Sequence, residues 1–241
     1  MSQSQPMSDR PKNELLLLHT VEQEVSSRLA QSLRNHAFIT LDKEAQSQQV
    51  KRLWDAEVKI GAKPAEPIPL ETSILEVFER SEIARHLLIL GTTGAGKTTV
   101  MLDLARTLVE KAEQTTDYPI PVLFELSAWK DANQTIPSWV VDELHSKYKV
   151  RKDIGKKWLE EQRLLPMLDG LDEVKLEHQE FCVAAINQWL QGDLHPISVV
   201  VCCRREEYGS YQIRLSLNGA ILLKALTDKR VQSYLFLVRE N

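Results

Sequence analysis

The 241-residue chain has a formal net charge of −4 and an apolar fraction of 43%. This apolar content is ordinary for a folded domain, and it excludes wholesale disorder. The slight acidity argues against a dedicated nucleic-acid binder, because such proteins usually carry a basic excess.

The chain shows no targeting or membrane-spanning segment. The apolar run nearest its start, Leu15 to Leu18, is shorter than the roughly 7–15 residues of a secretory signal core or the roughly 20 of a spanning helix. The three cysteines, Cys182, Cys202 and Cys203, include two neighbours in an apolar run and no CxxC pair. We therefore expect a soluble cytoplasmic protein with no membrane contact and with reduced, buried thiols.

The N-terminal part divides into a polar tail over residues 1–12, expected to be flexible, and a helical segment with a proline-rich linker over residues 13–69. From Asn13, apolar residues recur at a spacing of four and predict a helix with one apolar stripe, formed by Leu17, Val21, Val25, Leu29 and Leu33. We interpret the stripe as a face packed on the chain's own domain. A contact surface for another protein is the alternative. Prolines between Gly61 and Pro69 interrupt regular structure, and we place the domain boundary there.

Strand-like and helix-like segments alternate beyond this boundary. The segment Ser73-Ile-Leu-Glu76 predicts a capped short helix over residues 74–81. Further helices are expected over residues 98–113, 137–148, 152–162, 181–190 and 227–238. Strands are expected over residues 87–90, 120–126, 164–168, 197–203 and 221–223. Because continuous apolar strands alternate with helical crossovers, we predict an α/β fold with a mostly parallel, five-stranded sheet.

A glycine-rich loop of the form GxxxxGK[ST] follows the first strand and precedes a helix. Its glycines permit positive φ and a close approach of the backbone to phosphates, and its amides form an anion site at the helix N-terminus. Lys97 can reach the β- and γ-phosphates, Thr98 can offer a hydroxyl to Mg²⁺, and Thr99 can lie near the α-phosphate. We predict binding of a nucleoside triphosphate with Mg²⁺ by Gly91, Thr92, Thr93, Gly94, Ala95, Gly96, Lys97, Thr98 and Thr99.

A second motif places carboxylates after the strand over residues 164–168. Asp169 is expected to orient Mg²⁺, which tends to keep part of its hydration shell. Asp172 and Glu173 are candidates for polarising the water that attacks the γ-phosphate. An ordinary strand followed by an acidic turn is the alternative. Pro166 lies inside the strand, and the missing amide proton is typical of an edge strand.

A third motif places arginines at the end of the strand over residues 197–203. In open α/β sheets, ligands lie outside the carboxyl ends of the strands. Arg204, preferred over Arg205, is therefore expected to contact the γ-phosphate as a catalytic residue. A solvated charge paired with Glu206 or Glu207 is the alternative.

Together these motifs resemble the NACHT NTPases, in the STAND class of signal-transducing ATPases. The resemblance rests on Gly91-Thr-Thr-Gly-Ala-Gly-Lys-Thr-Thr99, Leu168-Asp-Gly-Leu-Asp-Glu-Val174 and Val199-Val-Val-Cys-Cys-Arg204. Residues 126–129 and 139–144 are similar to bacterial, particularly cyanobacterial, members. The resemblance covers about residues 70–238 and implies an NTPase domain over residues 70–226. It also implies a sheet in which the arginine strand lies between the loop strand and the acidic strand.

The resemblance further implies a preference for adenine and a switch that is ADP-bound at rest and ATP-bound and oligomeric when triggered. Such proteins often act in bacterial defence or signalling. Thr93 stands where many of these loops have proline, which should change the rigidity of the loop and not its chemistry. The chain ends at Asn241, inside a predicted helix, so residues 227–241 are expected to begin a truncated helical domain. Two other functions stay open: a housekeeping ATPase with continuous turnover, and a non-hydrolysing module that docks a partner through residues 13–60.

Overall fold

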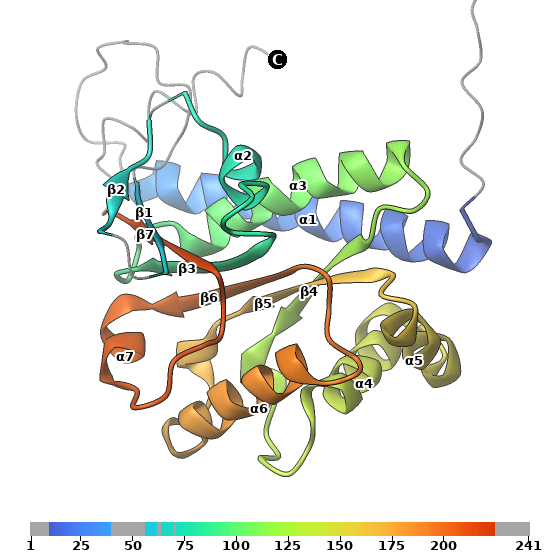
Figure 1. The fold of residues 1–241 in the computed structure, drawn as a ribbon. Helices are drawn as coiled ribbons and strands as arrows, with labels where there is room; N and C mark the ends of the chain where they lie inside the picture. Colours follow the sequence, from blue (N-terminus) through green and yellow to red (C-terminus); the bar gives the residue numbers. More distant parts are fainter. Residues whose placement is uncertain (1–9, 40–55, 62–63, 70, 225–241) are drawn as a thin grey trace, which may run out of the picture.

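The computed structural model describes residues 10–39, 56–61, 64–69 and 71–224. They form a seven-stranded sheet in the order β2-β1-β7-β3-β6-β5-β4, covered by helices on both faces (Figure 1). The strands are β1 (Ala56–Ile60), β2 (Glu66–Pro67), β3 (His86–Gly91), β4 (Ile120–Glu125), β5 (Leu164–Asp169), β6 (Val199–Arg204) and β7 (Gly219–Leu223). The helices are α1 (Lys12–Ile39), α2 (Ile74–Phe78), α3 (Lys97–Gln114), α4 (Ile136–Tyr148), α5 (Lys152–Glu160), α6 (Gln179–Gln191) and α7 (Arg205–Ser210).

Five strands, from β7 through β3, β6 and β5 to β4, run parallel and confirm the predicted α/β fold. The arginine strand β6 lies between the loop strand β3 and the acidic strand β5, as the resemblance implied. Helices α1 and α3 cover one face of the sheet, and α4, α5 and α6 cover the other (Figure 1). The parallel register brings the ends of four strands to one edge, with Gly91 on β3 opposite Arg204 on β6 and Glu125 on β4 opposite Asp169 on β5.

The predicted number of strands, five, is wrong for the whole sheet. Strands β1 and β2 extend it beyond β7 in the antiparallel sense, although we assigned their residues to a helical segment and a linker. Strand β1 is a short half-buried strand in which Ala56 and Val58 are buried and Lys59 is exposed. Strand β2 has only two residues, and its proline stands at the edge of the sheet, where a missing amide proton is tolerated. Strand β2 is too short for a periodicity signal, whereas the five residues of β1 do alternate and this signal was missed.

Strand β5 is an inner strand, although the missing amide proton of Pro166 is typical of an edge strand. The ladder with β4 runs the whole length of β5, from Leu164 to Asp169. The ladder with β6 contains only Met167 and Leu168, both beyond the proline. The missing amide proton therefore falls where β6 does not yet pair, so an inner strand can contain this residue.

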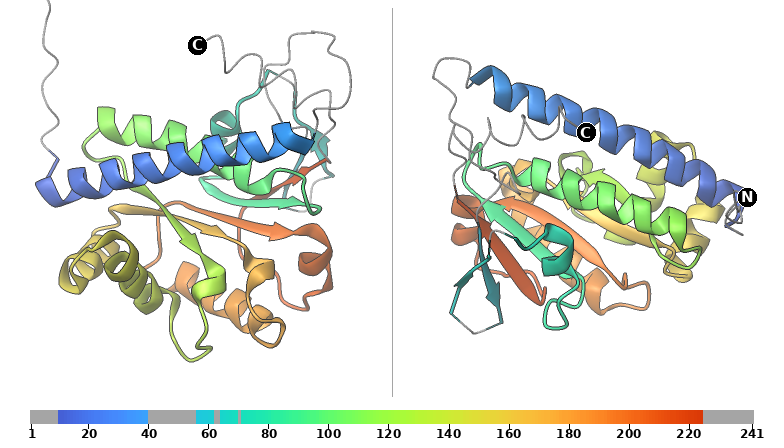
Figure 2. Two further views of the ribbon diagram at one scale, coloured as in Figure 1. Left: turned by 180° about the vertical axis from the view of Figure 1, so that it is seen from behind. Right: turned by 90° about the horizontal axis from the view of Figure 1, so that it is seen from above.

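Helix α1 packs along α3 and over β4 (Figure 2). Its predicted stripe is buried, from 0% exposure at Val21 to 8% at Leu29 and Leu33. This burial confirms that the stripe packs on the chain's own domain. Residues 10–12 are not the flexible tail that we predicted, because Arg10 is 3% exposed and donates hydrogen bonds to backbone carbonyls at the end of α3 and beyond it. Residues 1–9 of that predicted tail lie outside the described residues.

The local signals for helix starts are confirmed. Ser73 and Glu76 form the predicted capping box, although α2 ends at Phe78 rather than near residue 81. Pro137 lies in the first turn of α4. The short helix α7, which follows Arg204 directly, was not predicted, and the helix expected over residues 227–238 lies outside the described residues.

Burial also decides the chemistry of the cysteines. Cys182, Cys202 and Cys203 are buried and free, as predicted. Desolvation raises the pKa of Cys182 and of Cys203 to about 12, so these thiols stay protonated at neutral pH. No helix in the described part of the chain is long and apolar enough to cross a bilayer.

Candidate functional site

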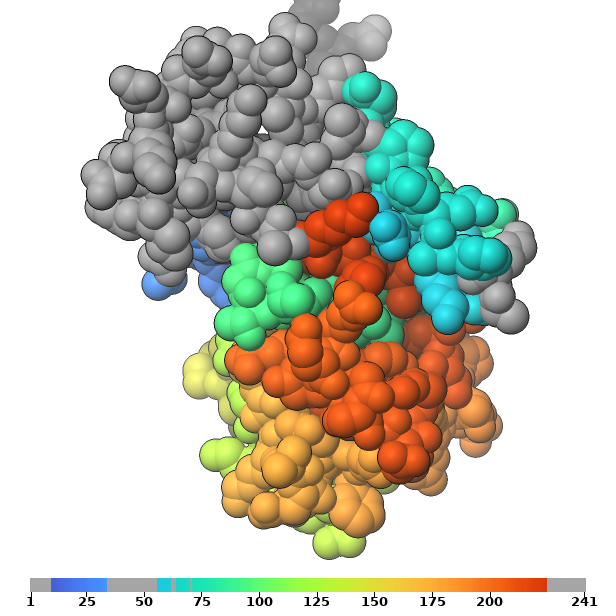
Figure 3. Space-filling view, turned by 90° about the vertical axis from the view of Figure 1, so that its left-hand side faces the viewer, coloured from blue at the N-terminus to red at the C-terminus, as the bar shows by residue number. Residues whose placement is uncertain are grey.

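A cavity of about 230 Å³ lies where β3, β5 and β6 end and α3 begins. On this side of the molecule, the green surface of the glycine loop and the start of α3 adjoins the orange surface of β6 and α7 (Figure 3). The cavity is lined by Ser32, Thr93, Gly94, Gly96, Lys97, Thr98, Thr99, Asp169, Gly170, Asp172, Glu173 and Arg204. The structure thus gathers all three sequence motifs around one space.

The glycine loop forms the wall of the cavity at the N-terminus of α3. Gly94 and Gly96 have φ of +75° and +83°, which side chains rarely adopt, and Gly96 caps the helix. A Cβ at Gly91 would lie 3.0 Å from the Cβ of Ala95, so any side chain there would have to push this tightly closed loop apart. The loop therefore presents backbone amides at a helix start, an arrangement suited to a phosphate group.

Lys97 supplies the positive charge of the loop. Its Nζ donates to the carbonyls of Gly91 and Thr92, each at 3.1 Å, so the ammonium group is held by the loop itself. Gly91, Thr92 and Ala95 do not line the cavity and instead form the strand end and the turn behind it. Six of the nine predicted loop residues thus line the cavity directly: Thr93, Gly94, Gly96, Lys97, Thr98 and Thr99.

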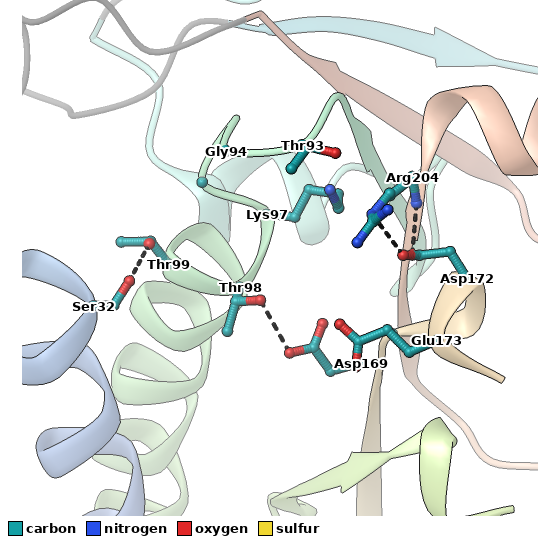
Figure 4. Close-up of a pocket in the computed structure, with 12 residues that line it drawn as sticks. Ser32, Thr93, Gly94, Lys97, Thr98, Thr99, Asp169, Asp172, Glu173 and Arg204 are labelled. Carbon is teal, nitrogen blue, oxygen red and sulfur yellow. Dashed lines mark hydrogen bonds and ion pairs between the residues drawn. The ribbon is translucent and has the colours of Figure 1, made fainter. Parts of the chain in front are cut away.

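Thr98 and Asp169 bring two oxygen ligands together from different elements. The hydroxyl of Thr98 on α3 donates to Oδ2 of Asp169 at the end of β5, at 3.1 Å (Figure 4). Burial raises the pKa of Asp169, while the hydrogen bond from Thr98 and the charge of Arg28 oppose that rise. Hydroxyl and carboxylate oxygens are ligands that Mg²⁺ prefers, so this pair fits a magnesium ion.

Asp172 and Arg204 hold one another. Oδ1 of Asp172 accepts from the backbone amide of Arg204 at 2.8 Å, and Oδ2 lies 2.9 Å from its Nε. The side chain of Asp172 is 4% exposed, whereas that of Arg204 is 40% exposed and lines the cavity. Nη1 of Arg204 also lies 3.5 Å from Oε1 of Glu207, so the ion pair of the alternative interpretation is present as well. Arg205, one residue on, is exposed and does not line the cavity.

Glu173 has a different environment from Asp172. Within the described residues, its carboxylate makes no hydrogen bond or ion pair, and it faces the cavity beside Asp169 (Figure 4). Partial burial and the charges of Asp169 and Asp172 raise its pKa. Gly170 adopts φ of +74°, and a Cβ there would lie 2.9 Å from Oε2 of Glu173, so glycine leaves the space that this carboxylate needs.

Two residues of α1 reach the site and were missed by the sequence analysis. Ser32 lines the cavity, and its Oγ lies 2.6 Å from Oγ1 of Thr99 (Figure 4). Arg28, one turn earlier, has its Nη2 3.6 Å from Oδ2 of Asp169. Their spacing of four could have placed them on one face of the helix. Which element that face meets is decided only by the packing of α1 on α3.

The chain was compared with known proteins. The model of the NACHT domain family matches residues 85–240, a range that contains the glycine loop, the acidic segment and Arg204. A search of the curated proteins finds no match. Helix α1 lies outside the matched range, so the family match does not account for Ser32 or Arg28.

Proposed function

Since this chain belongs to the NACHT family and carries a nucleotide-binding NTPase domain, we propose that the cavity binds ATP with Mg²⁺ and hydrolyses it slowly, as a signalling switch. The observation that carries this proposal is the convergence of the loop, the Thr98–Asp169 oxygen pair and Arg204 on one cavity. Adenine is proposed from the resemblance to NACHT proteins.

The proposed binding roles follow from the chemistry of each wall. The amides of the loop and the ammonium group of Lys97 bind the phosphates, and Thr98 and Asp169 hold the metal. Bound Mg²⁺ would neutralise phosphate oxygens and help to orient the γ-phosphate. Lys97 need only turn from the carbonyls of Gly91 and Thr92 to meet a phosphate, because its charge already lies at the loop.

For the hydrolytic step, we propose different roles for the two neighbouring acids. Glu173 polarises the attacking water, because its carboxylate faces the cavity and its raised pKa makes it a stronger base than an ordinary carboxylate. Asp172 instead orients Arg204, since both of its oxygens contact that residue. Arg204 then directs its guanidinium toward the γ-phosphate and stabilises the charge that develops there.

We also propose that the nucleotide state controls assembly, with ADP bound at rest and an ATP-bound homo-oligomer after a trigger. The resemblance of residues 126–129 and 139–144 to bacterial members supports a role in bacterial defence or signal transduction. The buried stripe of α1 favours a structural role for that helix over a docking surface for a partner protein.

The binding proposal is tested by releasing the nucleotide from purified protein and identifying it by chromatography. We expect ADP or ATP in nearly stoichiometric amount, and none from Lys97→Ala, because that change removes the charge on the phosphates. Retention of nucleotide by Lys97→Ala would contradict the assignment of the loop. A matched control is Lys111→Ala, at the far end of α3, where the ammonium group pairs with Glu79.

Turnover separates the switch from a housekeeping ATPase. In single-turnover experiments with excess protein, a switch converts its bound ATP slowly and releases little ADP. Rapid multiple turnover without any trigger would favour the housekeeping alternative. Tight nucleotide retention with no conversion of bound ATP over many hours would favour the non-hydrolysing module.

A further inference from the structure

Helix α1 lies outside the range that the family model matches. It places the guanidinium group of Arg28 beside Asp169, the carboxylate proposed to bind the metal. Nη2 of Arg28 lies 3.6 Å from Oδ2 of Asp169, the same oxygen that accepts the hydroxyl of Thr98 at 3.1 Å. One turn further along α1, Ser32 contacts the hydroxyl of Thr99 at 2.6 Å. The C-terminal half of α1 therefore touches the site at two adjacent points, of which Figure 4 shows the contact between Ser32 and Thr99.

Arg28 is held among three carboxylates that come from three elements. Its Nη1 lies 3.3 Å from Glu24 on α1 and 3.2 Å from Glu125 at the end of β4. Glu24 in turn accepts from Lys147 at 2.6 Å and from the hydroxyl of Tyr148 at 2.7 Å, both on α4. The side chain of Arg28 is 25% exposed, so the surrounding protein rather than solvent fixes most of its position.

The charges around Asp169 explain why a cation stands there. Its side chain is 15% exposed and lies near the carboxylates of Asp172, Glu173 and Glu125. An accumulation of negative charge with so little solvent needs a positive charge close by. Across the described residues, Arg28 is the group that forms an ion pair with Asp169.

A metal ion held by Thr98 and Asp169 would approach the oxygen that Arg28 faces. Two cations beside one carboxylate repel each other, and the repulsion is strong where solvent screening is weak. We propose that Arg28 is a positioning residue whose positive charge neutralises Asp169 when no metal is bound. Mg²⁺–nucleotide binding and the Arg28–Asp169 contact then oppose each other. This inference rests on the proposed function and names its regulation.

The two halves of α1 are held by different contacts. Loss of the Arg28–Asp169 contact on Mg²⁺–nucleotide binding should therefore affect one half of the helix more than the other. At its N-terminal end, Glu14 is 3% exposed and pairs with Arg10 at 3.0 Å and with Arg163 at 2.9 Å. Toward the other end, Leu29 and Leu33 are also buried, and the polar contacts that hold this half, those of Arg28 and Ser32, lie at the site itself. When Mg²⁺–nucleotide binds, the half of α1 that carries Arg28 loosens and the N-terminal half stays in place.

The first experiment measures ADP binding to the full chain by calorimetry as a function of Mg²⁺ concentration. In Arg28→Gln, the Mg²⁺ concentration for half-maximal ADP binding falls about fivefold, the scale of one partly exposed charge pair. ADP binding in EDTA does not tighten, because loss of a positive charge can only weaken the attraction for a free anion. Arg28→Lys, which keeps the charge, stays near the wild-type Mg²⁺ requirement.

Two controls separate this effect from a general loosening of α1 or a loss of charge. Arg163→Gln weakens the N-terminal attachment of α1 without touching the cavity, and Arg106→Gln removes a half-exposed charge from α3. Both keep the wild-type Mg²⁺ requirement. An unchanged or increased requirement in Arg28→Gln would overturn the inference, while loss of nucleotide in Lys97→Ala would still support the proposed function.

A second measurement needs no variant. Amide hydrogen exchange of the wild-type chain, with and without Mg²⁺–ADP, should show faster exchange over residues 25–33 of α1 and no change over residues 14–21. Uniform protection of α1 on nucleotide addition would overturn the inference. Absence of any ADP binding to the wild-type chain would overturn the proposed function and this inference with it.

Discussion

Asp172 contacts Arg204 through both oxygens, at 2.8 Å to its backbone amide and at 2.9 Å to its Nε. The side chain of Asp172 is buried, and Arg204 reaches the cavity. Asp172, in the acidic segment after β5, thus fixes the orientation of Arg204 at the end of β6. The sequence placed Asp172 among the candidate catalytic acids. In the structure, both of its side-chain oxygens contact Arg204 instead.

Asp172→Asn should uncouple Arg204 from β5. We expect the free energy of unfolding to fall by about 1–2 kcal/mol, because one charge-assisted contact is lost while the arginine can still reach solvent. Single-turnover hydrolysis should fall about tenfold, and ADP affinity should stay within about threefold. Denaturant melts, quenched-flow assays and calorimetry measure the three quantities. Asp103→Asn, which breaks an exposed pair with Arg106, serves as the control and should change none of them.

Glu173→Gln should separate hydrolysis from binding. Removal of the proposed base lowers the single-turnover rate by about 10²-fold or more, while bound ATP is retained because this side chain makes no contact with the loop. Chromatography of the nucleotide after timed quenching gives both results. Glu177→Gln, a nearby exposed acid, is the control. Wild-type hydrolysis in Glu173→Gln would move the role of base to another residue.

The same substitution should stabilise the nucleotide-free protein in a pH-dependent way. The pKa of Glu173 is raised by partial burial and by its acidic neighbours, so its contribution to stability is present at low pH and is lost as pH rises through the folded-state pKa. The ordinary pKa of a glutamate side chain sets the pH window. The Tm of Glu173→Gln should therefore match that of wild type near about pH 4 and exceed it increasingly toward about pH 7. A Tm difference that shrinks as pH rises would contradict this sign.

Gly170→Ala should cost stability and also disturb Glu173. The positive φ of +74° alone costs about 1–2 kcal/mol for a residue with a side chain. The added Cβ would also lie 2.9 Å from Oε2 of Glu173, so hydrolysis should fall as well. Gly61→Ala provides the matched control, because Gly61 has φ of +55° with no described atom within 4 Å of the added Cβ. It should lose similar stability, measured by denaturant melts, and keep full hydrolysis.

Much of the fold could be predicted from local patterns. Strands β3, β4, β5 and β6 are buried apolar runs. Ser73, Glu76 and Pro137 mark helix starts through backbone geometry that is decided within a few residues. Strands β1 and β2 were missed for different reasons: the second partner of β1 lies far along the chain, and β2 is too short for a pattern. Strand β1 pairs with residues 219–223, and β2 has only two residues.

The sequence by itself determined the glycine loop, the acidic strand end and Arg204, because each is a short run whose residue types carry their chemistry. The tertiary structure decided which of them meet and how. It placed Asp172 on Arg204, left Glu173 facing the cavity, and packed α1 so that Arg28 reaches Asp169. The reason is that contacts between residues on different elements depend on how whole elements pack, and no local pattern in this sequence encodes the face on which α1 meets the site.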